Sequence, residues 1–267
     1  MDVSLPTDQP LLTRADAAGV ARLTLNRPAA RNALSGALMG ALEAELSAIA
    51  GDAAVKVVVI AGAGPAFCAG HDLREMRAAT PEGHAALFSQ CSRLMLRIVR
   101  LPKPVIAEVH GIATAAGCQL VASCDLAVAA DSARFATPGV NIGLFCSTPM
   151  VALSRAVGRK AAMEMLLTGE LIGAEQARAL GLINRVVPLS GLAAEVDALA
   201  AGIAAKSPLT LAIGKEAFYR QAEMDLDAAY AYAASVMVRN MAARDAGEGI
   251  DAFLEKRAPV WTDSVPQ

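Results

Sequence analysis

Hydrophobic and polar residues follow two different periods along the chain. The segment GVARLTLNRP (19–28) alternates and then stops at a proline, which predicts a strand entering a turn. The runs VKVVVIAGAG (55–64) and KPVIAEVHG (103–111) are almost continuously apolar, which predicts strands covered on both faces. After Ser35, an N-cap residue, leucine and isoleucine recur at helical spacing, which predicts a helix. Strands and helices thus alternate through about residue 190, as is typical of an α/β architecture with crossover connections.

Beyond residue 190 the hydrophobic pattern becomes entirely helical. Ser207 and Pro208 form an N-cap and first-turn pair that starts one of the helices. The predicted helices cover residues 192–205, 208–220, 226–244 and 249–257. We therefore expect an α/β core over residues 1–190, followed by a helical C-terminal subdomain over residues 191–267.

Composition and charge exclude several classes of protein. Hydrophobic residues make up 55% of the chain but aromatic residues only 4%, so small side chains should pack closely and let backbones approach each other. The net charge of -2 lacks the basic excess that binding to nucleic acid or acidic membranes usually needs, so we expect neither partner. The uncharged run 135–154 is interrupted by prolines and glycines, and we interpret it as buried interior rather than a membrane span.

Cysteine and histidine usage indicates a reducing compartment and no metal site. The chain has five cysteines without C-x-x-C spacing and three scattered histidines, so no metal-ligand set assembles and no metal or redox cofactor is expected. The N-terminal MDVSLPTDQP is acidic and has no apolar run of the kind that marks a signal peptide. These features predict a cytoplasmic protein.

Two segments place small residues immediately before helix-forming stretches, namely AFCAGHDL (66–73) and TAAGCQL (114–120). Helix N-termini expose unpaired N–H groups, and two such ends facing each other would stabilise one oxygen that becomes negative during a reaction. The glycines at 62–64 do not add a dinucleotide site, because Phe67 stands where the third glycine of that motif belongs. We interpret them as a turn that ends a strand.

The order of motifs resembles the crotonase, or enoyl-CoA hydratase/isomerase, superfamily from about Val20 to the end of the chain. The matching segments are LNRPAARNALS, AFCAGHDLREM, KPVIAEVHGIATAAGCQLVASCDLAVAADSARFATP, RAVGRKAAMEMLLTGE, GLINRVVP and EGIDAFLEKRAPVW. AAGCQLVASCD and FATPGVNIGLFCSTP are further similar to the enoyl-CoA hydratase domain-containing subgroup of animal mitochondria. The resemblance implies a ββα spiral core and a C-terminal subdomain that forms a homotrimer or a dimer of trimers.

The resemblance implies that an acyl-CoA thioester binds with its carbonyl oxygen between the backbone N–H groups of His71 and Ala116. These donors would stabilise a thioester enolate. The two glutamates of the family's hydratases match Gln119 and Gly139, so both acid-base groups are missing here. Glutamine orients water but does not accept its proton, which predicts a lyase-family protein with weak or absent hydratase turnover.

Other activities stay open at this point. A family member that decarboxylates an acyl-CoA has histidine in the same G-H-D context, so the His71 ring is a second candidate, and a non-catalytic acyl-CoA-binding module is a third. Asn141 is an alternative group for holding water. Cys146 is expected to shape the acyl pocket and Asp72 to brace the turn beside His71.

The resemblance also implies where coenzyme A, which is part of the substrate and the only cofactor-like group expected, would lie. The NRPAARNAL turn and a C-terminal helix, sometimes of the neighbouring subunit, surround the nucleotide in this superfamily. The alternative interpretation of the basic residues is a solvated surface. The matching positions are Arg27, Ala29, Arg31, Ala69, Gly70, Asp72, Leu73, Cys146, Phe253 and Lys256.

Overall fold

The strands of the protein form two sheets that share one core. The structure is a computed structural model that describes residues 9–263 and residue 265. The large sheet has the strand order β1-β2-β3-β5-β7-β10 and the small sheet has the order β4-β6-β8-β9. Their bounds are β1 Leu12–Ala17, β2 Val20–Leu25, β3 Val57–Gly62, β4 Ala66–Cys68, β5 Val105–Val109, β6 Ile112–Thr114, β7 Leu126–Ala130, β8 Arg134–Ala136, β9 Ile172–Gly173 and β10 Arg185–Val187.

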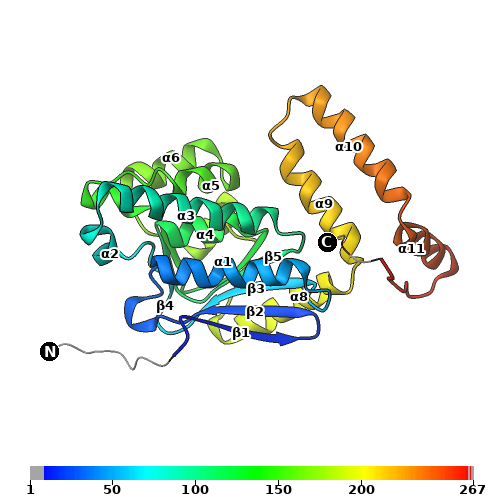
Figure 1. Ribbon diagram of the computed structural model, residues 1–267, viewed down its shortest axis with the longest axis horizontal. Coiled ribbons are helices and arrows are strands. Elements are labelled where there is room, and N and C mark those ends of the chain that lie inside the picture. The colour runs from blue at the N-terminus through cyan, green and yellow to red at the C-terminus, as the bar shows by residue number, and fades with distance from the viewer. Residues whose placement is uncertain (1–8, 264, 266–267) are drawn as a thin grey trace.

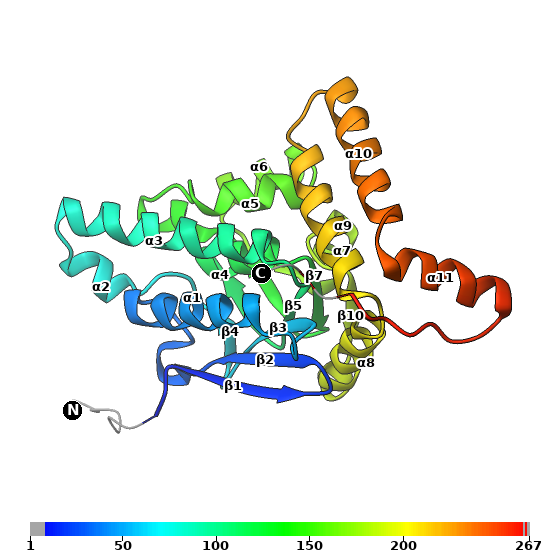
Figure 2. The same ribbon diagram turned by 45° about the vertical axis from the view of Figure 1, so that its right-hand side comes forward.

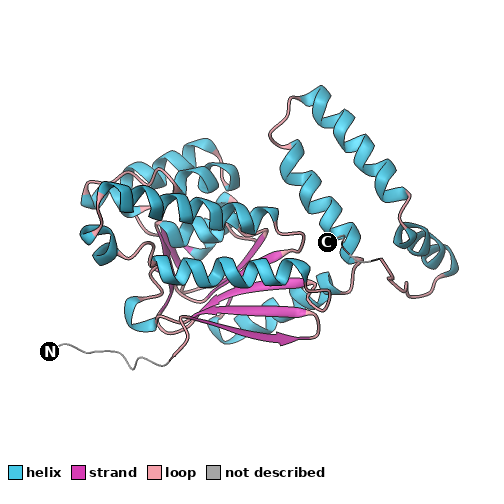
Figure 3. Ribbon diagram, in the orientation of Figure 1, coloured by secondary structure: helices cyan, strands magenta, loops and turns pink. Residues whose placement is uncertain are grey.

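Helices cover both sheets and extend from the core at the C-terminal end (Figure 1, Figure 3). The α-helices are α1 Gly36–Gly51, α2 Leu73–Ala78, α3 Pro81–Arg100, α4 Ala116–Ser123, α5 Pro149–Ala156, α6 Arg159–Thr168, α7 Ala174–Leu180, α8 Leu192–Ala204, α9 Pro208–Gln221, α10 Leu226–Met241 and α11 Arg244–Glu255. Short 3-10 helices are η1 Pro28–Ala30, η2 Pro138–Ile142 and η3 Leu189–Gly191.

The chain alternates between the two sheets as it proceeds. β3, β5 and β7 lie side by side in the large sheet, and the strand that follows each of them, β4, β6 or β8, enters the small sheet. Pairing along each series is parallel. A helical segment then returns the chain to the next strand pair. This is the predicted ββα spiral.

The apolar runs form the central strands for the reason that the sequence predicted. In β3, Val58 and Ile60 belong to the core cluster that includes the buried residues of α1. Val57 and Val59, which point to the opposite face, belong to a second cluster beneath α8. The predicted N-cap is confirmed, because the Ser35 hydroxyl accepts a hydrogen bond of 3.2 Å from the Leu38 N–H.

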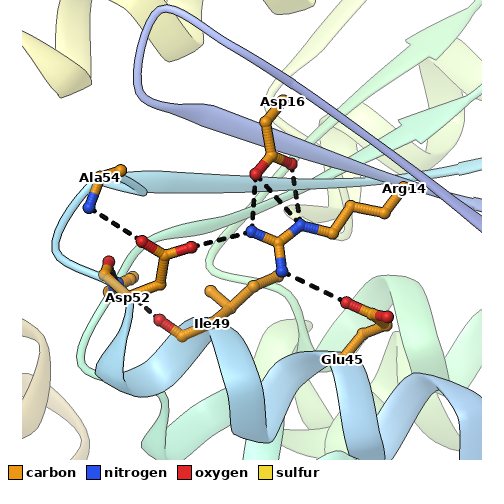
Figure 4. Close-up of polar contacts among 7 residues, drawn as sticks. Arg14, Asp16, Glu45, Ile49, Asp52 and Ala54 are labelled. Carbon is orange, nitrogen blue, oxygen red and sulfur yellow. Dashed lines mark hydrogen bonds and ion pairs between the residues drawn. The ribbon is translucent and has the colours of Figure 1, made fainter.

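A single arginine with three carboxylates fixes the first strand to α1 and its C-terminal end (Figure 4). The Arg14 guanidinium contacts Asp16 at 2.6 Å, Glu45 at 3.3 Å and Asp52 at 3.0 Å. Asp52 also accepts from the Ala54 N–H at 3.0 Å, and these donors hold the pKa of its carboxyl below the usual value. The edge strand is therefore tied to the helix that covers it.

The helical end of the chain begins to leave the core at α9, not at residue 191 as expected. Leu192, Val196 and Ala200 of α8 are buried against the large sheet. α8 therefore completes the core, whereas α9, α10 and α11 extend beyond it (Figure 2). The predicted helices 226–244 and 249–257 are α10, which ends at Met241, and α11, which starts at Arg244.

A buried ion pair holds α9 on the core. Lys215 Nζ donates to Asp125 Oδ2 at 2.6 Å and to the backbone carbonyls of Ile98 and Lys103 at 2.9 Å. The Tyr219 hydroxyl donates to the other Asp125 oxygen at 2.9 Å. These contacts fix the root of the C-terminal helices.

The prediction that residues 135–154 are buried interior is only partly right. Phe135 is fully buried, but Ile142 is 59% exposed and Val151 is 50% exposed. Among the described residues, no single helix is long and apolar enough to cross a membrane, and one bent pair, residues 189–204 with 208–221, passes that test only in combination. The N-terminal segment from which the absence of a signal peptide was predicted lies mostly outside the described residues.

Candidate functional site

The two small-residue segments meet where β4 and β6 end. Cys68 pairs with Ala113, and the Thr114 hydroxyl donates to the Ala69 carbonyl at 3.1 Å. A β-carbon on Gly117 would lie 2.1 Å from the Cys68 carbonyl oxygen, and one on Gly70 would lie 2.9 Å from the β-carbon of Ala115. Only glycine fits at such distances, so these positions explain how two backbones come into direct contact.

Two N–H groups lie without a partner at this junction. In the parallel bridge between Leu34 and His71, Leu34 N–H donates to Gly70 O and Asp72 N–H donates to Leu34 O, so His71 N–H points away from that bridge. Ala116 is the first residue of α4, whose N–H has no intrahelical acceptor. Neither group donates to another described residue. Both donors are therefore unpaired within the part of the chain that the structure describes.

The turn before α4 is strained. Ala115 has a φ of 50° and a ψ of -118°, although alanine strongly prefers negative φ. Such strain costs about 1 to 3 kcal/mol and is concentrated at functional sites. The β-carbon position of Gly70 lies 3.4 Å from Ala116 N, which places the strained turn directly beside the residue that precedes His71. The strained residue thus stands immediately before the first N–H of α4.

Asp72 braces the loop that carries His71. One oxygen accepts from the N–H groups of Arg74 and Glu75 at the start of α2, and the other accepts from Arg27 Nη2 at 2.9 Å. Burial raises the pKa of this carboxyl, but these donors outweigh the effect and hold it below its usual value. Leu73, the next residue, is 55% exposed.

The basic residues of the N-terminal turn do not all present free charge. Arg27 was expected beside coenzyme A, but its guanidinium donates to the Ala33 carbonyl at 2.5 Å and to Asp72. Arg31 and Ala29 are exposed, and the Arg31 carbonyl accepts from Ala69 N–H at 3.0 Å. Arg31 is therefore the residue of this turn whose charge faces solvent next to the site.

Gln119 lies one turn into α4, on the side that faces α3. Its side chain is buried at 4% exposure, and its Oε1 lies 3.8 Å from the thiol sulfur of Cys91. Sequence reasoning did not single out Cys91, because nothing in the spacing of α3 and α4 signals this contact.

The space around Gly139 leaves no room for any side chain. A β-carbon there would lie 2.4 Å from the Leu144 carbonyl oxygen and 2.9 Å from Cys146 Sγ. Cys146 itself is buried, and burial raises the pKa of its thiol, which disfavours the thiolate that a nucleophile requires. Asn141 lies two residues further along η2 and is exposed, whereas Gly139 is buried.

The His71 ring is packed rather than presented. Its ring lies edge-on to Phe88 with centroids 5.6 Å apart, and both ring nitrogens are buried without a hydrogen-bond partner. Burial lowers the pKa of His71, and the nearby Leu34 backbone and Glu75 charge oppose this only partly. The ring as a whole is partly exposed, whereas its two nitrogens are covered by protein.

The C-terminal residues lie far from this junction within one chain. Phe253 is 83% exposed on α11 and Lys256 follows that helix. Figure 1 and Figure 2 show α11 on the side of the molecule opposite α2. The predicted contact of Phe253 and Lys256 with coenzyme A therefore requires a neighbouring subunit.

A cavity of about 420 Å³ lies between the end of α1 and the starts of β3 and β5, at the opposite edge of the sheet, and Asp52, Lys56 and Lys103 line it. The Lys103 ammonium already donates to backbone carbonyls there. In residues 9–263 and 265, no three His, Cys, Asp or Glu side chains are grouped to hold a metal ion.

Comparison with known proteins identifies the family. The enoyl-CoA hydratase/isomerase family model matches residues 15–264. The chain belongs to the enoyl-CoA hydratase/isomerase family. A crystal structure of an enoyl-CoA hydratase from Mycobacterium smegmatis superposes with a TM-score of 0.93 at 57% identity, covering 95% of this chain and 99% of that one. The crotonase fold with its C-terminal helical region is thus confirmed.

Two relatives carry the same domain name. Enoyl-CoA hydratase domain-containing protein 3, mitochondrial, from Xenopus laevis is 49% identical over 92% of this chain and 84% of that protein. The crystal structure of human enoyl Coenzyme A hydratase domain-containing protein 3 superposes with a TM-score of 0.91 at 48% identity, over 94% of this chain and 100% of the other. The mitochondrial names of such relatives overturn the expectation of a cytoplasmic family member, because reduced cysteines do not distinguish these compartments.

Proposed function

We propose that the protein binds an acyl-CoA thioester and stabilises its enolate between the N–H groups of His71 and Ala116. The observation that supports this proposal is that both N–H groups lack an acceptor among the described residues, beside a junction where only glycine fits. Donors aimed at a developing oxyanion typically contribute about 3 to 4 kcal/mol each. Arg31 supplies an exposed positive charge beside the same junction for the phosphates of coenzyme A.

Ordinary hydration of enoyl thioesters should be weak or absent. That reaction needs one group to activate water and another to protonate the α-carbon, and each is worth roughly 10²- to 10⁴-fold in rate. Gln119 has no titratable side chain and Gly139 has no side chain. Because the backbone donors are retained, the protein keeps the means to stabilise an enolate but lacks the matched acids.

The burial of both ring nitrogens of His71 weighs against a decarboxylase that uses this histidine. A ring nitrogen that contacts an acyl group must first be exposed to the site, and both nitrogens are buried without partners. Release of carbon dioxide from malonyl-CoA or methylmalonyl-CoA, lost in His71→Ala, would restore that alternative. Turnover of none of a panel of enoyl-, malonyl- and 3-oxoacyl-CoA thioesters, with binding retained, would favour a non-catalytic binding module.

The proposal is tested with acetoacetyl-CoA, whose enolate is followed by its ultraviolet absorbance. Bound to the wild-type protein, the enolate should form at a lower pH than in free solution, because two N–H donors favour the negative form. Gly70→Ala should abolish this shift by pushing the two segments apart. Gly143→Ala is the matched control, since Gly143 also has a positive φ of 77° but nothing within 4 Å of its β-carbon position. An unshifted enolate in the wild type would refute the proposal.

We also propose a homotrimer or a dimer of trimers assembled through the C-terminal helices. Large apolar side chains are exposed there, including Phe218, Tyr230, Val238, Met241, Phe253 and Leu254. Many large exposed apolar side chains on three successive helices are typical of an interaction surface. Sedimentation should give a trimer or hexamer for the wild type and smaller species for Phe253→Asp, and a monomeric wild type would refute this assembly.

A further inference from the structure

A second cavity, lined by arginine side chains, lies between the C-terminal ends of α1 and α3. Its volume is about 300 Å³, and its lining includes Arg93, Arg97 and Arg100 of α3 together with Leu96 and Pro102. The three arginines are four and three positions apart, a spacing that places side chains on one face of a helix. The other face of α3 is buried in the core, so this row of arginines stays on the solvent side.

This arginine cavity is separate from the junction of the candidate site. On α3, Phe88, whose ring packs against that of His71, stands nine positions before Arg97. At 1.5 Å per residue, this separation is about 14 Å along the helix axis. A ligand in the arginine cavity would therefore occupy a site of its own, and its binding does not depend on the proposed function.

The arginines of this cavity have little compensating negative charge nearby. Arg93 lies 3.9 Å from Glu43, which is a long contact for an ion pair. The other carboxylates at this end of α1 are already bound to Arg14. Within residues 9–263 and 265, Arg97 and Arg100 form neither an ion pair nor a side-chain hydrogen bond. The cavity is therefore a local concentration of positive charge, although the chain as a whole carries a net charge of -2.

The dipole of α3 accounts for only part of this positive charge. Arg97 and Arg100 lie in the last turn of the helix, where a cation is stabilising. Arg93 lies about two turns from the C-terminus, and the effect of the dipole falls off within the last turn. Like charges three or four positions apart also destabilise a helix. A bound anion would remove this repulsion.

We propose that the arginine cavity binds a small ligand that carries two or more phosphate groups. The guanidinium group matches phosphate oxygens with two parallel hydrogen bonds. Arg93 and Arg100 are seven positions apart, which is about 10 Å along the helix axis, so several phosphate groups match the row better than one. Leu96 and Pro102 provide an apolar wall for the part of the ligand that carries the phosphates. The volume lies at the lower end of the range for small-molecule sites.

The proposal is tested by titrating the whole chain with sodium tripolyphosphate in a calorimeter at low salt. We expect saturable binding that weakens as sodium chloride is added, because salt screens exposed charges. Arg97→Gln and Arg100→Gln should each weaken binding by about tenfold, since each removes a charge-assisted hydrogen bond. Arg178→Gln is the matched control and should leave the affinity unchanged, because it removes the same charge from an exposed helical arginine outside the cavity.

Two further titrations distinguish the sources of the phosphate groups, one with ATP and one with phosphatidylcholine vesicles that contain phosphatidylinositol 4,5-bisphosphate. Binding of ATP that is weakened in Arg97→Gln assigns the cavity to a soluble nucleotide. Binding of the vesicles that is weakened in the same variant assigns it to a lipid headgroup. Failure of the wild type to bind tripolyphosphate, ATP or the vesicles overturns the proposal. Equal affinity in the wild type, Arg97→Gln and Arg100→Gln also overturns it, because the anion is then bound elsewhere.

Discussion

Adding one methyl group at Gly117 should disable the site without touching any side chain in it. A β-carbon at this position lies 2.1 Å from the Cys68 carbonyl oxygen, which is 1.3 Å closer than the 3.4 Å at which ordinary contact begins. The two nearest obstructing atoms are the carbonyl oxygen and carbon of Cys68, so α4 has to move by about that amount. A hydrogen bond of about 2.9 Å from Ala116 N–H to a bound oxygen then lengthens to roughly 4.2 Å, beyond hydrogen-bond range.

Loss of one donor should weaken stabilisation of the enolate by roughly 10²- to 10³-fold. In the acetoacetyl-CoA assay this raises the pH at which the bound enolate forms by about 2 to 3 units in Gly117→Ala. Overpacking should also lower the free energy of unfolding by about 1 to 3 kcal/mol, so folding is checked by circular dichroism. Gly202→Ala is the control, because Gly202 is also helical and has nothing within 4 Å of its β-carbon position. A folded Gly117→Ala protein with the wild-type enolate titration would refute the backbone-donor model.

Three further predictions follow from buried groups. Gly139→Glu should lower the melting temperature and give no gain in crotonyl-CoA hydration, because its β-carbon would lie 2.4 Å from the Leu144 carbonyl oxygen. A stable variant that hydrates crotonyl-CoA would refute the claim that this position has no room for a side chain. The pKa of His71 is lowered in the folded state, so between that pKa and about 6.5 the unfolded chain binds more protons and stability rises with pH. In His71→Phe, the free energy of unfolding by urea should depend less steeply on pH between pH 5 and 7.5, by at most about 1.4 kcal/mol per pH unit. An unchanged slope would refute the lowered pKa of His71. Lys215→Met should lower the free energy of unfolding by about 3 to 5 kcal/mol, and adding Asp125→Asn should recover part of it, as seen in the same denaturation assay; additive losses would argue against a coupled pair.

The long elements of the fold could be predicted from the sequence because each carries its own signal. β3 is a run of β-branched residues, and Ser35 and Ser207 each cap a helix through their own hydroxyl. The strands of the small sheet, such as β4 and β6, have three residues each, which is too short for a period to be read. Their position depends on pairing between distant segments, which no local pattern encodes.

The candidate site likewise has features that the sequence indicates and features that depend on distant segments. The donors at His71 and Ala116 were expected from the resemblance, and the structure leaves both without a partner. The engagement of Arg27 could not be predicted, because its partner Asp72 lies 45 positions along the chain. Likewise, the crowding at Gly139 depends on how the chain folds back at Leu144. Residue types and spacing indicate which chemical groups a site contains. The other residues of the chain that bind or crowd those groups become known only from the folded structure.

The bond between Arg27 and Asp72 has a practical consequence for anyone who studies substrate affinity by mutagenesis. Replacing this arginine would loosen coenzyme A binding even if the guanidinium never touched a phosphate, because Asp72 would lose its outer restraint and the adjacent His71 main chain would drift. A higher Michaelis constant in such a variant would therefore be mistaken for the loss of a contact with the nucleotide. Truncated thioesters without the nucleotide, such as pantetheine derivatives, would separate the two causes. A disturbed His71 loop would weaken binding of the truncated thioester as well, whereas a lost nucleotide contact would not.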